Sequence, residues 1–233
     1  MSLFSKGRKR KLSGTTIQKI LDSLMTIFAL YMIYELLWVY PYAIIYRGIF
    51  VSILVALVMI FYHFSDDGRE PDKIKIFDYV LSILSLLVGI YIVLNSDRLV
   101  FRVQFCDKVF ISDIVFSIHK FLIVLEATRR VMGWPLVIIA IIAIFYPFFG
   151  KYIPGMFGHR GFNFLWFIDQ LFMSTNGIFS TPVKVVSSYV FMFVLFGEFL
   201  KATGGGDFFF DFAMSMTGHK RGGLAKTASP PTV

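Results

Sequence analysis

Long apolar runs alternate along the chain with short segments that carry charges, prolines and glycines. A membrane-spanning helix needs roughly 20 mostly apolar residues, so each run predicts one span. The predicted fold is therefore all-α: a polytopic helical membrane protein with about six transmembrane helices. The runs lie at about 20–40, 47–64, 76–94, 111–127, 131–149 and 182–200.

The run at 111–127 is interrupted by Asp113, His119, Lys120 and Glu126. It could cross the membrane or lie flat as an amphipathic helix at the interface. Lys and Arg favour the cytoplasmic side of a membrane. Six crossings with an internal N-terminus place about twice as many Lys and Arg inside as outside, whereas leaving 111–127 outside makes the two sides nearly equal. The charge pattern favours six spans, with both termini cytoplasmic.

An aromatic-rich segment, 162–179, lies between the last two runs. It combines several Phe residues and Trp166 with a polar stripe that includes Asp169 and Gln170. Aromatic side chains are enriched at the headgroup boundary. The segment therefore predicts a horizontal interfacial helix.

The composition excludes an ordinary soluble domain, because 57% of the residues are apolar, 16% are charged and the mean hydropathy is +0.72. The net charge is +8, but the basic residues collect at the two ends, and residues 1–19 hold no acid. A basic tail before an apolar run is typical of a cytoplasmic membrane flank, so we expect membrane lipid and no nucleic acid as a partner. Cys106 is the single cysteine, and the histidines lack ligand spacing, so no metal or other cofactor is predicted.

No catalytic motif is present, and the sequence does not predict an enzyme. The run Gly204, Gly205, Gly206 and Asp207 lacks the Lys and Ser or Thr of a phosphate-binding loop. Its glycines instead predict the end of one helix, and Asp207 the N-cap of the next.

Glu126 stands three residues before Arg129 and four before Arg130, a spacing that predicts a structural ion pair on one helix face. Its expected role is to anchor the inner end of that helix; binding of ions or lipid headgroups is the alternative. Ionisable residues in or near other spans are functional hypotheses by default. Glu35 is either a coupling-ion or proton site, or it contacts a partner helix or the outer membrane interface. Asp22, Lys120 and Glu198 belong to the same group.

Several stretches, in order and spacing, resemble the fused membrane permease of TRAP transporters, the tripartite ATP-independent periplasmic carriers, in their TAXI branch. The resemblance covers roughly 20–227. The stretches are LEATRRVMGW (125–134), YIPG (152–155) with HRG (159–161), YVFMFVLFG (189–197), GDFF (206–209) and GHKRGGLAK (218–226).

The resemblance implies a sodium-coupled secondary carrier of the bacterial inner membrane, for organic-acid-type solutes, that works with an extracytoplasmic solute-binding protein. It also implies a division into a cytoplasmic basic tail (1–19), a four-helix part like the small subunit (20–130), a fusion helix and linker (131–155) and the start of the large transport subunit (156–233). The family's sodium and substrate sites lie in glycine- and serine-rich re-entrant hairpins of the large subunit. No substrate-binding residue is therefore named in this chain.

Members of that family continue for several hundred residues beyond the stretch that ends at Lys226, whereas this chain ends at Val233. The expectation is an N-terminal fragment of a permease, inactive alone, whose partner is the remainder of the large transport subunit. The alternative is a stand-alone membrane scaffold that docks a separate large transport subunit.

Overall fold

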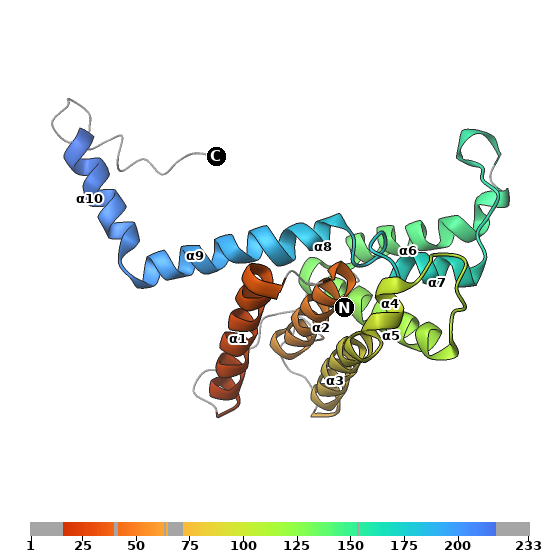
Figure 1. The fold of residues 1–233 in the computed structure, drawn as a ribbon, viewed down its shortest axis with the longest axis horizontal. Helices are drawn as coiled ribbons and strands as arrows, with labels where there is room; N and C mark the ends of the chain where they lie inside the picture. The colour runs from red at the N-terminus through yellow and green to blue at the C-terminus, as the bar shows by residue number, and fades with distance from the viewer. Residues whose placement is uncertain (1–15, 40–41, 63, 65–71, 153, 218–233) are drawn as a thin grey trace. The chain divides into compact units, whose positions relative to one another are not determined.

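The computed structural model describes residues 16–39, 42–62, 64, 72–152 and 154–217 (Figure 1). The predicted basic tail lies mostly outside these residues, as do the polar loop at 65–71 and the segment 218–233. The described part is mainly helical and contains no β-strand, which confirms the predicted all-α class. The chain divides into two units, Met1–Lys184 and Val185–Val233.

The first unit contains the helices that were expected to form the small-subunit-like part and the start of the large subunit. A π-helical turn, Glu35–Val39, extends the first helix, and 3₁₀ turns at Gly150–Tyr152 and Gly155–Phe157 follow the sixth. The α-helices are α1 (Thr16–Tyr34), α2 (Ala43–Phe61), α3 (Asp72–Leu94), α4 (Ser96–Phe101), α5 (Ile111–Met132), α6 (Trp134–Phe149), α7 (Phe164–Phe172) and α8 (Thr181–Val185).

Among the residues that the structure describes, five helical stretches are long and apolar enough to cross a membrane. They cover Leu21–Trp38, Ala43–Phe61, Ile76–Leu94, Trp134–Tyr152 and Thr181–Ala202. These match five of the six predicted spans. The sixth, α5, is long enough, but it carries more charged residues than the other five.

Helices α2 and α3 pack side by side through small residues (Figure 1). The hydroxyl of Ser85 donates to the backbone carbonyl of Ser52 over 2.9 Å, and Ser82 donates to that of Ala56 over 3.2 Å. A Cβ atom added at Gly89 would lie 2.9 Å from the Cβ of Ser52. Small and hydroxylated residues are the usual means by which helices approach closely in membranes.

The aromatic segment does not form the single horizontal helix expected at 162–179. α7 ends at Phe172, and the chain then reverses, with the Ile178 N–H donating to the Leu171 carbonyl over 2.8 Å. A Cβ at Gly177 would lie 2.2 Å from that carbonyl oxygen. Gly177 therefore permits a tight turn that the aromatic pattern did not reveal. Phe172 and Phe179 on either side of the turn are both buried.

The second unit contains a π-helical segment, Val186–Val190, then α9 (Phe191–Ala202) and α10 (Gly205–Thr217). Gly204 adopts a left-handed φ of 74° between the two helices, a conformation that favours glycine. α10 begins at Gly205, so Asp207 lies inside its first turn and does not precede it as an N-cap. The helix thus begins at Gly205, three residues before the Phe208 that an N-cap at Asp207 predicts.

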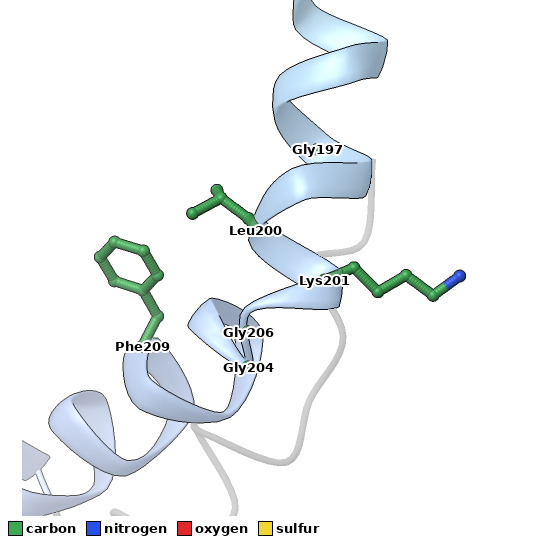
Figure 2. A pocket seen from close by; sticks show the side chains of 6 residues that line it. All are labelled: Gly197, Leu200, Lys201, Gly204, Gly206 and Phe209. Atoms are coloured by element: carbon green, nitrogen blue, oxygen red, sulfur yellow. The ribbon is translucent and has the colours of Figure 1, made fainter. Parts of the chain in front are cut away.

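A cavity of about 320 Å³ lies at this junction, lined by Gly197, Leu200, Lys201, Gly204, Gly206 and Phe209. Figure 2 shows Leu200 and Phe209 on one side of the junction and the amino group of Lys201 directed away from them. Lys201 instead pairs with Glu198 over 3.8 Å, and both side chains are largely exposed.

Candidate functional site: the charged face of α5

α5 buries most of its charged residues against other helices of the first unit. Asp113, Ser117, Lys120 and Arg130 recur at helical spacing and are buried. The exposed side chains of α5 are mostly apolar (Ile111, Val115, Ile118, Leu122 and Met132), with Ser112 and His119 exposed among them. This is the reverse of a helix lying on a membrane surface, whose charges face water.

The C-terminal end of α5 carries an ion cluster that we call the Asp78 cluster: Asp78, Glu126, Arg129 and Arg130. Glu126 accepts hydrogen bonds of 2.7 Å from both Arg129 and Arg130. Nη2 of Arg130 also lies 2.7 Å from Oδ1 of Asp78 on α3, and neither of these side chains is exposed. The cluster thus joins α5 to α3.

The same arginines bind the end of α2. Arg130 donates to the carbonyl of Tyr62 over 3.2 Å, and Arg129 donates to that of Phe64 over 3.1 Å. The Arg129 guanidinium also lies 4.4 Å from the centre of the Phe64 ring, a favourable cation–π arrangement. The two arginines therefore satisfy backbone carbonyls that follow the last turn of α2.

Lys120 lies near the middle of α5. Its ammonium donates to the hydroxyl of Ser52 on α2 over 2.8 Å, and the side chain is fully buried. Among the described contacts this hydroxyl is its acceptor, and no carboxylate pairs with it. Lys120 therefore differs from the other buried charges of α5.

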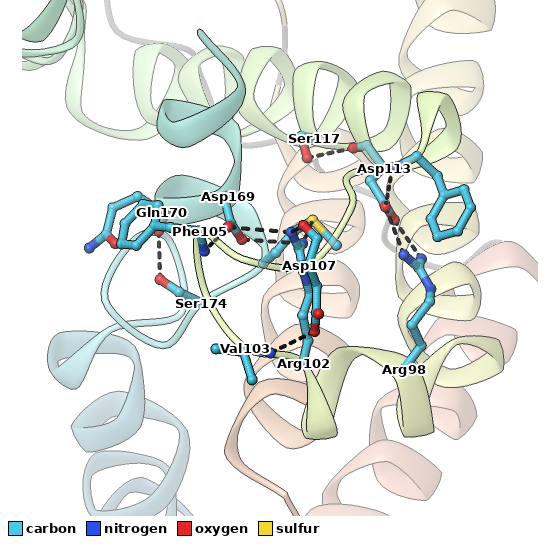
Figure 3. A network of polar contacts seen from close by, with 12 residues as sticks. Arg98, Arg102, Val103, Phe105, Asp107, Asp113, Ser117, Asp169, Gln170 and Ser174 are labelled. Atoms are coloured by element: carbon cyan, nitrogen blue, oxygen red, sulfur yellow. Dashed lines mark hydrogen bonds and ion pairs between the residues drawn. The ribbon is translucent and has the colours of Figure 1, made fainter. Parts of the chain in front are cut away.

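The N-terminal end of α5 belongs to a second group, the Asp113 network (Figure 3). Arg98 on α4 donates two hydrogen bonds to the Asp113 carboxylate, of 2.6 and 2.8 Å. The Tyr91 hydroxyl and the Phe110 N–H also donate to Asp113. These bonds to Asp113 raise the pKa of Arg98 above its ordinary value.

A second arginine, next to this network, holds α7 (Figure 3). Nη1 of Arg102 lies 3.2 Å from Oδ1 of Asp169, and both side chains are almost completely buried. The Phe105 N–H donates to the same carboxylate over 2.8 Å, and Phe105 adopts a left-handed φ of 63°. Arg47 on α2 donates to the Phe179 carbonyl over 2.6 Å. α7 and its turn are thus fastened to α2 and to the segment between α4 and α5.

The residues named from sequence fall into two groups. Glu126, Arg129 and Arg130 lie together, whereas Gly204, Gly205, Gly206 and Asp207 lie in the other unit. The sequence reading did not identify Asp78 or Asp169 as ion-pair partners. Each is the lone acid of an otherwise apolar stretch. A single acidic residue in such a stretch indicates a basic partner on another helix, and this pattern could have identified both residues from the sequence.

The remaining ionisable candidates do not join these clusters. Asp22 is exposed on α1, and Glu35 is half-buried at the start of the π-helical turn. Within the described residues, no group of three or more His, Cys, Asp and Glu side chains could hold a metal ion. The charges of α5 are arranged as ion pairs and hydrogen bonds between helices.

Comparison with known proteins identifies one part of the chain. No curated protein and no solved structure matches it. Residues 120–229, from the middle of α5 onward, match the family model described as "Tripartite ATP-independent periplasmic transporter, DctM component". That family is a transporter family, not an enzyme family. The match supports the conclusion that this segment is similar to the membrane permease component of TRAP transporters.

Proposed function

We propose that the chain is the membrane permease component of a sodium-coupled, binding-protein-dependent TRAP transporter, of the TAXI branch, for organic-acid-type solutes. The observation that carries the proposal is the family match over 120–229. The five candidate membrane spans support it, as do the resemblance of 125–134 and 152–161 to fused TRAP permeases and the TAXI-like stretches at 189–197, 206–209 and 218–226.

Within such a transporter we assign the described residues a scaffold role. α7 stands at the start of the permease part and is held through Asp169 by Arg102 of the preceding part. The four-helix part therefore fixes the position from which the transport subunit begins. Solute would arrive on an extracytoplasmic binding protein, and sodium and solute would bind in hairpins of the large subunit.

We further propose that α5 is a sixth span, in an inner membrane with both termini cytoplasmic. Its 22 residues give a length of about 33 Å at 1.5 Å per residue, enough to cross a hydrocarbon core of about 30 Å. Its buried charges contact neighbouring helices, and most of its exposed side chains are apolar, as a lipid-facing surface requires.

Reconstitution tests this function. The chain, a separately expressed TAXI-type large subunit and the binding protein are placed in proteoliposomes with an inward sodium gradient. We expect uptake of a radiolabelled organic acid that needs all three proteins and stops when potassium replaces sodium. Uptake that persists without this chain, or without sodium, contradicts the proposal; uptake by this chain alone contradicts the scaffold role.

The alternative is a stand-alone scaffold that docks a separate large transport subunit. The contacts of Arg47 and Arg102 with the α7 segment support it, because they join the first part of the chain to a segment inside the family match. Under this alternative, a tagged chain should retain the large subunit through affinity purification and gel filtration. Its consistent absence from such complexes would exclude docking.

A further inference from the structure

A hairpin at 150–163 folds back on the end of α6. The His159 N–H donates to the Gly150 carbonyl over 3.0 Å, and the Phe162 N–H donates to the Pro147 carbonyl over 3.0 Å. Pro147 and Gly150 both lie within the candidate span Trp134–Tyr152. The hairpin is therefore tied to the last turns of a membrane helix and lies level with its end.

His159 packs inside this hairpin. Its ring lies against Gly150, where an added Cβ would come within 1.9 Å of Nε2. Its Nδ1 accepts the Gly161 N–H over 3.1 Å, and its ring centre lies 4.9 Å from that of Tyr146. The Tyr146 hydroxyl donates to the Phe157 carbonyl over 2.6 Å. The hairpin is thus packed around the His159 ring, and the bond from Tyr146 holds its tip at Phe157 against α6.

The surface of the hairpin combines large apolar side chains with basic ones. Met156 is 92% exposed and Phe157 67% exposed. Lys151 and Arg160 are also exposed and form no ion pair with the described residues. The segment 150–163 contains no Asp or Glu.

We propose that this hairpin binds anionic phospholipid at the membrane surface. Met156 and Phe157 enter the boundary between headgroups and acyl chains, which removes their apolar surface from water. Lys151 and Arg160 contact the lipid phosphates, as basic residues beside an apolar interfacial segment do. A lipid surface is favoured over a protein partner because the backbone bonds to Pro147 and Gly150 keep the tip at the level where the span ends.

A fluorophore at the tip tests the proposal in the full chain. Cys106 is replaced by Ser, Met156 by Cys, and the new thiol is labelled with an environment-sensitive dye. The protein is placed in nanodiscs of phosphatidylcholine, with or without phosphatidylglycerol, and with plain or brominated acyl chains. We expect a blue-shifted emission that brominated chains quench, with stronger quenching when phosphatidylglycerol is present.

Charge variants separate the basic residues from the apolar tip. Lys151→Gln with Arg160→Gln should abolish the phosphatidylglycerol dependence, whereas Lys108→Gln, which removes an exposed lysine outside the hairpin, should leave it unchanged. Equal melting temperatures would show that all variants fold. Quenching by aqueous iodide but not by brominated lipid overturns the proposal, and so does a blue shift that appears only with the binding protein. Equal quenching by brominated chains with and without phosphatidylglycerol would contradict the proposed preference for anionic lipid.

Discussion

Arg130 on α5 and Asp78 on α3 form an ion pair across the first unit, with 2.7 Å between Nη2 and Oδ1 and no exposure of either side chain. Charges removed from water in this way need each other, since the loss of one leaves the other uncompensated. Glu126 shares Arg130, so one guanidinium serves two carboxylates on two helices.

Arg130→Gln should therefore destabilise the protein strongly. Loss of one partner of a buried pair costs about 3–5 kcal/mol, and here it removes the guanidinium that lies 2.7 Å from Asp78 and also binds Glu126. Thermal unfolding in detergent measures the effect. Lys201→Gln, which removes the exposed partner of Glu198, is the matched control and should leave the midpoint unchanged. Equal midpoints for the two variants would contradict this role of Arg130.

Lys120 and Ser52 give a second prediction, in which two changes offset each other. Ser52→Ala removes the hydroxyl that accepts from the Lys120 ammonium and should cost about 1–3 kcal/mol, the usual penalty for a buried polar group left without its partner. Adding Lys120→Met should restore the stability, because no buried ammonium remains. Chemical unfolding of both variants measures this, and equal losses in the single and double variants would refute it.

The apolar runs in the sequence predicted all five candidate spans of the described residues. They could do so because hydropathy and length are properties of each segment alone. The ion pair of Glu126 with its arginines also follows from sequence, since its spacing is local. Asp78 and Asp169 are different: their partners lie 52 and 67 residues away in the chain, and only the packing of helices brings them together. Likewise, the turn at Gly177 depends on its contact with the carbonyl of Leu171, which no local pattern encodes.

Arg102→Gln should loosen α7 from the rest of the first unit. The variant removes the partner of Asp169, and a lost hydrogen bond to a charged group costs about 1.5–3 kcal/mol. Hydrogen exchange over 164–180 should therefore be on the order of ten- to a hundredfold faster, as local opening becomes easier. Lys201→Gln, at an exposed lysine of the second unit, serves as the control. An unchanged amide exchange rate in Arg102→Gln would contradict the inference that the ion pair of Arg102 with Asp169 stabilises the position of α7.

Two glycines should respond in opposite directions to alanine. A Cβ at Gly177 would meet the Leu171 carbonyl at 2.2 Å, whereas Gly197 has nothing within 4 Å. Gly177→Ala should cost about 1–3 kcal/mol or more through backbone displacement. Gly197→Ala, inside a helix, should gain up to about 1 kcal/mol. Melting midpoints measured in the same detergent decide between these signs.

Topology can be read from the native cysteine. Cys106 is exposed and follows α4, on the side that the charge pattern assigns to the exterior. A membrane-impermeant maleimide should label it in intact cells, and Cys106→Ser should remain unlabelled. In that background, Arg69→Cys should react only after permeabilisation. The reverse pattern would invert the proposed orientation.

The inward charges of α5 also bear on how the protein is made. Asp113, Lys120 and Arg130 find their counter-charges and acceptors on α4, α2 and α3, all of which precede α5 in the chain and are therefore synthesised first. On its own, α5 would expose these charges to lipid at a cost of about 2.5–3.5 kcal/mol for each charge near the bilayer centre. Under the six-span proposal, α5 therefore inserts against helices that are already in place. These earlier helices supply the polar groups that bind the charges of α5 as it passes from the translocation machinery into the membrane.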